Sequence, residues 1–197
     1  MKITQRKDDW IQTYTGRAFY LLDPRVEDID ILDIAHALAL ENRYAGHTCE
    51  PYSVAQHCVL ASRIVPAKDA LWALLHDAPE AYIRDIPRPL KPFLGEYRAI
   101  ERRIMIQVCA RFDLTYAQPE SIDEADLILL RTEQRDLMGA PPMPWRLIVG
   151  VQPLDEIIVP WGWQQAQAEF FSCFEQLIHA EALLSGTADE QPKGANE

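Results

Sequence analysis

Apolar residues recur every three or four positions along most of this chain, and this spacing restricts the fold more than any other feature. Positions three and four apart share one face of a helix, so the spacing predicts amphipathic helices. We expect only short extended pieces, one between residues 16 and 30 and others at 147–149 and 157–159. The sequence therefore predicts an all-α, mostly helical fold, with helices over 31–39, 54–64, 68–83, 95–112, 121–138 and 163–184.

Polar residues mark where these helices begin. Asp28 to Asp30 precede the first helix and Ser53 precedes the second, and both residue types accept hydrogen bonds from free amides at a helix N-terminus. We find no internal repeat and no linker that would divide the chain. We therefore expect a single domain over residues 1–184, followed by a polar tail over 185–197 that we expect to be disordered.

Composition excludes several classes of protein. The 197 residues carry a formal net charge of −11, which argues against a nucleic-acid binder because such proteins need a basic face. No window approaches 18 apolar residues and MKITQRKDDW lacks an apolar signal core, so we expect a cytoplasmic protein without a membrane span. The four cysteines form no CxxC pair, which argues against a zinc site built on thiolates.

Ionisable residues gather in one stretch, Ala70–Pro92. It begins as an apolar helix and then carries His76-Asp77, Glu80 and Asp85, followed by a proline-stiffened basic loop. Two further candidates lie elsewhere, since His57 falls within the second predicted helix and Asp126 within the fifth. The apolar faces of these helices must meet in one core, so we expect their polar groups to meet there too.

Two imidazoles and two carboxylates suit one divalent ion, either Mn²⁺, Co²⁺, Zn²⁺ or Mg²⁺. Such an ion lowers the pKa of a bound water toward neutrality and polarises a phosphoryl oxygen. Each group also has an ordinary structural interpretation, His57 as a core histidine and Asp126 as a surface acid.

The residues resemble a known family, the HD-domain metal-dependent phosphohydrolases. The H…HD…D order matches that family, and the pieces RYAGHT, PYSVAQH, HDAPEAYIRDIPRPLK and DEADLILL are similar to its small branch of bacterial 5′-deoxynucleotidases and phage dATP triphosphohydrolases. The likeness covers roughly residues 30–140. It implies a helical bundle with a metal site between helices, in which the ligands are His57, His76, Asp77 and Asp126.

The resemblance also implies roles for residues around the metal. Glu80 matches an acidic residue that acts in proton transfer, and Asp85 matches one that orients water or protonates the leaving oxygen. Arg43 and Lys91 match phosphate contacts, and Tyr44 matches an aromatic residue that packs on the sugar or base.

Two further positions near these residues bear on the site. His47 follows Gly46 near Arg43 and is a candidate substrate contact. The chain departs from the pattern at Arg84, where relatives commonly have glycine.

The expected activity is hydrolysis of a phosphoester of a small nucleotide, most plausibly a deoxynucleotide, by a homodimer or higher homo-oligomer. Two reactions stay open, namely removal of phosphate from a 5′-monophosphate and removal of triphosphate from a dNTP. Arg84 and Arg88 mildly favour the second. A hydrolase of cyclic or signalling nucleotides, and a non-catalytic nucleotide-binding module, are the alternatives.

Overall fold

The computed structural model describes residue 6 and residues 9–186, and it confirms the predicted all-α fold. Two short strands, β1 (Ile11–Gln12) and β2 (Ala18–Phe19), form an antiparallel hairpin before the first helix. The helices are α1 (Ile31–Leu40), α2 (Val54–Ile64), α3 (Ala70–Leu75), α4 (Glu80–Ile83), α5 (Gly95–Arg111), α6 (Glu120–Leu137) and α7 (Trp163–Gly186). The tail that we expect to be disordered spans residues 185–197, and residues 187–197 lie outside the described part of the chain.

Two of the predicted helix starts are capped as their residue types indicate. The Asp30 carboxylate accepts a hydrogen bond from the amide of Leu32 at 3.0 Å, and the Ser53 hydroxyl accepts one from the amide of Gln56 at 3.2 Å. Each bond satisfies an amide that has no partner within its helix.

The single helix predicted over 68–83 is wrong, because the structure has α3 and α4 separated by a turn at residues 76–79. Pro79 explains the break. It has no N–H to donate to the carbonyl of Leu75, and its ring clashes with that carbonyl in a continuous helix. The chain instead closes a tighter turn, in which the Ala78 amide donates to Leu75 O at 3.0 Å. The His-Asp pair therefore lies at a helix end, and Glu80 begins a new helix.

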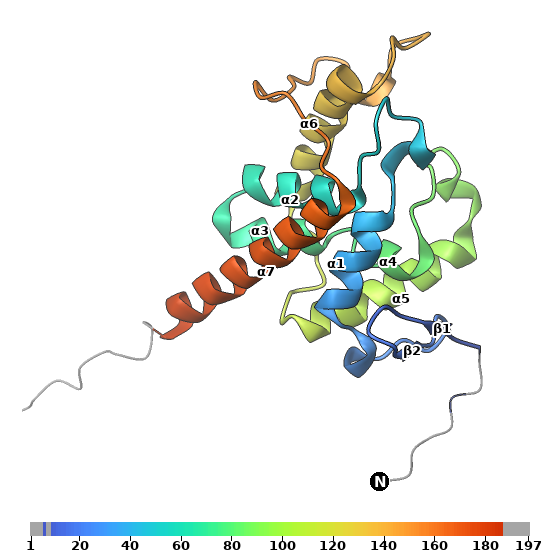
Figure 1. The fold of residues 1–197 in the computed structure, drawn as a ribbon, viewed down its shortest axis with the longest axis vertical. Coiled ribbons are helices and arrows are strands. Elements are labelled where there is room, and N and C mark those ends of the chain that lie inside the picture. The colour runs from blue at the N-terminus through green and yellow to red at the C-terminus, as the bar shows by residue number, and fades with distance from the viewer. Residues whose placement is uncertain (1–5, 7–8, 187–197) are drawn as a thin grey trace, which may run out of the picture.

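Helix α2 lies at the centre of the molecule. It packs against α1, α3, α6 and α7, and Figure 1 shows the long α7, in orange and red, running beside α1, α2 and α3. Residues 54–59 of α2 are all buried. A polar residue in this part of α2 must therefore find its partners inside the protein.

The segment between α6 and α7 shows how such partners are found. The two extended pieces predicted there are not strands, since Arg146–Ile148 forms a 3-10 turn and residues 157–159 pair with no strand of the described chain. Their backbone bonds to side chains instead: Gln56 donates to Val159 O at 2.9 Å and accepts from the Trp161 amide at 2.8 Å. This segment is therefore held against α2 without a sheet.

None of the helices in the described residues is both long and apolar enough to cross a membrane.

Candidate metal centre

The structure brings the four predicted ligands together from three helical regions. His57 lies in α2, His76 and Asp77 follow α3, and Asp126 lies in α6. His57 Nε2 lies 3.3 Å from His76 Nε2, 3.3 Å from Asp126 Oδ1 and 3.9 Å from Asp77 Oδ2. His76 Nε2 lies 3.2 Å from Asp77 Oδ2. The ligand atoms of His57, His76 and Asp126 lie within 4.8 Å of one another, and Asp77 adjoins both imidazoles.

The other nitrogen of each imidazole decides what these Nε2 atoms can do. His57 Nδ1 lies 2.7 Å from Glu133 Oε1, and His76 Nδ1 lies 2.6 Å from the carbonyl oxygen of Ala73. Both partners are acceptors, so in each neutral ring the proton sits on Nδ1 and the lone pair on Nε2. Two such lone pairs and two carboxylates form a set of groups that could hold a cation.

The spacing fits a divalent ion. Ligand atoms about 2.1 Å from such an ion lie about 3.0–3.4 Å from one another in octahedral or tetrahedral arrangements. Three of the four measured separations, 3.2, 3.3 and 3.3 Å, fall within this interval. Cys58 also lies near His76 and Asp77, but burial raises the pKa of its thiol to about 11, so it is a weaker candidate ligand than the carboxylates.

The electrostatics of the cluster favour positive charge between these groups. Burial alone would raise the pKa of Asp77, but the neighbouring His76 and Arg43 outweigh burial and hold that pKa below its usual range. The pKa of Asp126 is likewise low, because His57 and Arg43 outweigh the effect of burial. Burial would lower the pKa of His76, but the carboxylate of Asp77 raises it. Both carboxylates are therefore ionised and ready to bind a cation.

Glu133 is a residue of this site that the sequence reasoning missed. Its side chain is fully buried, and besides His57 it accepts hydrogen bonds from the hydroxyls of Tyr44 and Tyr52, the latter at 2.9 Å. Arg43 Nε lies 3.4 Å from its second oxygen. The signal was present in the helical spacing, since Glu133 lies four residues beyond the buried Leu129 and seven beyond Asp126, on the inner face of α6.

Arg43 lies against the cluster, beside its carboxylates. It is mostly buried, and its terminal nitrogens lie 3.5 Å from Asp77 Oδ2 and 3.9 Å from Asp126 Oδ1. The following residues Tyr44, Ala45 and Gly46 have φ values of 56°, 50° and 78°. Left-handed backbone is unfavourable for residues other than glycine and is concentrated at functional sites. The turn holds Arg43 and Tyr44 against the cluster at a cost in backbone energy.

Glu80 lies beside the cluster with one oxygen engaged and one free. Lys91 Nζ lies 3.3 Å from Glu80 Oε1, whereas Oε2 is buried and has no hydrogen-bond partner among the described residues. Burial raises the pKa of Glu80, and repulsion from Asp77 and Asp85 raises it further. An orphaned, easily protonated carboxylate oxygen at this position suits exchange of a proton with a water or substrate oxygen.

Lys91 lies among carboxylates. Besides Glu80 it lies 3.3 Å from Glu101 Oε1 and 3.9 Å from Asp85 Oδ1, so the structure engages it with three acidic side chains. The Asp85 amide donates to Glu41 Oε1 at 2.8 Å, which holds the loop in place.

Arg84, the residue before Asp85, has a backbone conformation that suits the glycine expected at this position. Arg84 has φ 68° and ψ 157°, a conformation that glycine adopts freely, and its side chain extends into solvent with 77% of its surface exposed.

His47 is the predicted site residue that the structure leaves outside the cluster. Its side chain is exposed, and its backbone amide closes the Arg43–Gly46 turn by donating to Tyr44 O at 3.0 Å. It therefore ends the turn that carries two other candidate residues.

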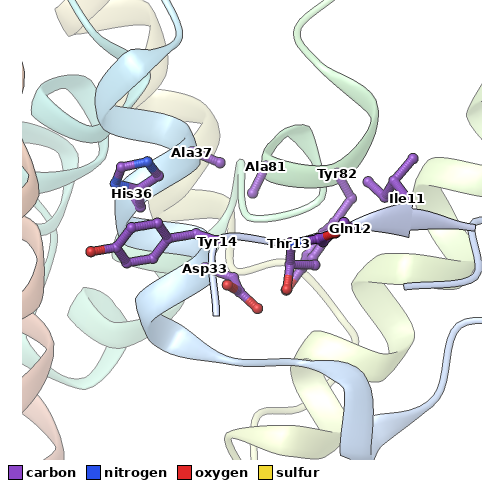
Figure 2. Close-up of a pocket in the computed structure, with 9 residues that line it drawn as sticks. All are labelled: Ile11, Gln12, Thr13, Tyr14, Asp33, His36, Ala37, Ala81 and Tyr82. Carbon is purple, nitrogen blue, oxygen red and sulfur yellow. The ribbon is translucent and has the colours of Figure 1, made fainter. Parts of the chain in front are cut away.

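A separate hollow of about 320 Å³ lies between the hairpin, α1 and α4 (Figure 2). In Figure 2 the ring of Tyr14 lies against His36, and the ring centroids are 3.8 Å apart. Asp33 accepts hydrogen bonds from the amide and hydroxyl of Thr15, at 2.7 and 3.0 Å. None of the predicted site residues lines this hollow.

The chain resembles proteins from two bacteria. It is 39% identical over 170 residues to the uncharacterized protein YfdR of Escherichia coli (strain K12), an alignment that covers 85% of this chain and 95% of YfdR. It is 37% identical over 147 residues to the uncharacterized protein RCAP_rcc00048 of Rhodobacter capsulatus, covering 68% of this chain and 75% of that protein. No protein-family model matches the chain.

Proposed function

We propose that this chain, which belongs to the same family as YfdR of Escherichia coli, is a divalent-metal-dependent phosphohydrolase of the HD-domain type that acts on small nucleotides. The observation that carries the proposal is the convergence of two imidazole Nε2 atoms and two carboxylates, with both Nδ1 atoms held as donors. The order of the motifs that supply these groups is that of the HD-domain phosphohydrolases.

The proposed cofactor is one Mn²⁺, Co²⁺, Zn²⁺ or Mg²⁺ ion held by His57, His76, Asp77 and Asp126. When bound, such an ion activates water as a nucleophile and polarises a phosphoryl oxygen. Glu133 orients His57 through its Nδ1 proton, so the imidazole can point only its Nε2 lone pair at the ion.

The surrounding residues have complementary roles in the proposal. Arg43 binds phosphate oxygens with its planar guanidinium, and the ring of Tyr44, next to that guanidinium, packs against the sugar or base. Glu80 Oε2 takes a proton from the attacking water, and Lys91 stabilises the resulting arrangement of charges around Glu80 and Asp85. Asp85, whose Oδ1 lies 3.9 Å from Lys91 Nζ, either orients the attacking water or passes the proton that Glu80 has taken up to the leaving oxygen.

Resemblance to the small branch favours a deoxynucleotide as the substrate. We also propose a cytoplasmic location and a homo-oligomeric state. The general acidity of the chain argues against a nucleic acid bound along a basic face and is compatible with a small anionic substrate bound at one locally basic position.

Phosphate release from a panel of nucleotides tests the proposal. Nucleoside mono- and triphosphates, with cyclic nucleotides as a further arm, are incubated with each of the four ions and with Asp126→Asn and Asp123→Asn variants. Asp123 is an exposed acid on the same helix, so its variant controls for the loss of one charge from α6. We expect hydrolysis by the wild type and Asp123→Asn, and a loss of at least about 100-fold in Asp126→Asn.

The products identify the reaction. Orthophosphate from deoxynucleoside monophosphates indicates a nucleotidase, and tripolyphosphate with free nucleoside indicates a triphosphohydrolase. Turnover of cyclic nucleotides alone supports the signalling alternative. Metal binding without any turnover overturns the proposal and favours a nucleotide-binding module.

A further inference from the structure

A second hollow, of about 340 Å³, adjoins the metal centre on the side of α5. His76, Asp77 and Glu80 line one wall, and Arg98 and Arg102 of α5 line another. We call it the α5 pocket. A group bound at the metal centre would therefore lie beside a hollow that Arg98 and Arg102 also line.

The carboxylates of the α5 pocket already have cationic partners. Arg43 lies 3.5 Å from Asp77, and Lys91 lies 3.3 Å from both Glu80 and Glu101. In contrast, neither Arg98 nor Arg102 forms an ion pair with a carboxylate anywhere in the described chain. The pocket therefore has two arginines whose charge is not neutralised by a neighbouring acid.

Arg98 and Arg102 lie close enough on α5 to contact the same anion. They are four residues apart on α5, so their side chains leave the same face of the helix from consecutive turns. Two like charges at this spacing repel each other, and an anion between them removes the repulsion. Arg98 and Arg102 are both exposed, so in a chain of net charge −11 their guanidinium groups are available to a dissolved anion that enters the pocket.

The wall opposite α5 is held in place before any ligand binds. The indole N–H of Trp72 donates to the carbonyl oxygen of Thr115 at 3.0 Å, which ties the loop before α6 to α3. Tyr116 and Gln118 of this loop line the pocket. This hydrogen bond therefore helps to hold the loop side of the pocket in place before a ligand binds.

We propose that Arg98 and Arg102 bind the further phosphate groups of a substrate whose reacting phosphate lies at the metal centre. This inference rests on the proposed function and narrows it, because it assigns a substrate with more than one phosphate group. Each guanidinium offers paired N–H donors to phosphate oxygens, so two arginines on consecutive turns of α5 can contact two of the phosphate groups of one chain.

The test measures anion binding separately from turnover. Inorganic tripolyphosphate and orthophosphate are titrated into the full-length, metal-free protein by calorimetry, so that chelation of metal by the anion does not contribute. The variants are Arg98→Gln/Arg102→Gln and the matched control Arg63→Gln/Arg103→Gln, which removes two charges from positions outside the pocket. Circular dichroism verifies that each variant is folded.

We expect the wild type to bind tripolyphosphate at least about tenfold more tightly than orthophosphate, because two charge-assisted contacts are added. Arg98→Gln/Arg102→Gln should lose about tenfold or more of the tripolyphosphate affinity, and the control should match the wild type. Equal tripolyphosphate affinity in the wild type and in Arg98→Gln/Arg102→Gln would overturn the inference.

Kinetics on the metal-loaded protein separate the two proposals. A raised KM of Arg98→Gln/Arg102→Gln for nucleoside triphosphates, with an unchanged KM for monophosphates, supports the inference. Hydrolysis that is equally efficient in this variant for both classes overturns it and leaves the proposed function standing. Arginine-dependent tripolyphosphate binding without any hydrolysis overturns the proposed function and leaves the anion site standing.

Discussion

Replacement of Glu133 by glutamine tests whether the buried carboxylate that binds His57 Nδ1 contributes to the metal affinity of the site. Glutamine keeps the shape of the side chain and one carbonyl oxygen, but it removes the negative charge. Four groups contact the carboxylate: His57 Nδ1 at 2.7 Å, Tyr52 at 2.9 Å, Tyr44, and Arg43 at 3.4 Å. Arg43 retains two other carboxylates, so the change does not leave its charge unpaired.

The size of the effect follows from the bond to His57. A hydrogen bond to a charged acceptor contributes about 1.5–3 kcal/mol and a neutral one about 1 kcal/mol, so the expected loss is about 1–2 kcal/mol. Each 1.4 kcal/mol corresponds to about a tenfold change in affinity. We therefore expect Glu133→Gln to weaken metal binding by about 5- to 30-fold, without removing any ligand.

Competition with a chromophoric chelator measures this affinity for Zn²⁺ or Co²⁺, and the visible spectrum of the Co²⁺ protein reports its ligand geometry. Glu124→Gln is the matched control, since Glu124 is an exposed acid on the same helix. An altered Co²⁺ spectrum in Glu133→Gln alone would support an orienting role. Metal affinity within twofold of the wild type, in a folded Glu133→Gln protein, would refute the reasoning.

Two further predictions concern stability. Arg84→Gly should raise the free energy of unfolding by about 1 kcal/mol. The φ of 68° and ψ of 157° cost about 1–3 kcal/mol for arginine, whereas glycine adopts them freely but adds about 1 kcal/mol of chain entropy to the unfolded state. A urea denaturation midpoint below that of the wild type would contradict this. Glu80→Gln should stabilise the metal-free protein at pH 8 and do so less at pH 4. Because the pKa of Glu80 is raised in the folded protein, the folded state loses stability as pH rises above the pKa that Glu80 has in the unfolded chain. Glutamine does not ionise, so the variant does not lose this stability at high pH. Thermal denaturation at both pH values measures the difference, and a difference independent of pH would show that the pKa of Glu80 is not raised.

Local sequence was sufficient for most of the helices. Apolar spacing predicted α1, α2, α5, α6 and α7 to within about three residues at each end, and Asp30 and Ser53 cap the helices they precede. It failed at Pro79, where a local rule about proline competes with the helical period and prevails. It also failed between α6 and α7, where backbone amides bond to side chains of distant helices, as the Trp161 amide does to Gln56.

The candidate site divides in the same way. The order of His57, His76-Asp77 and Asp126 in the sequence predicts that these groups meet, and the structure brings them together. Only the tertiary structure shows that Glu133, 76 positions from His57, supplies the acceptor for its Nδ1 proton.

The sequence alone thus determined five of the helices, two of their caps and which residues are candidates to hold a metal, because periodicity and residue chemistry are local properties. Packing decided the rest: which acid accepts the hydrogen bond of His57, which three carboxylates surround Lys91, and which arginines line the α5 pocket together with Asp77. These contacts join positions that the chain separates, and their geometry depends on how α2, α5 and α6 are placed around one core.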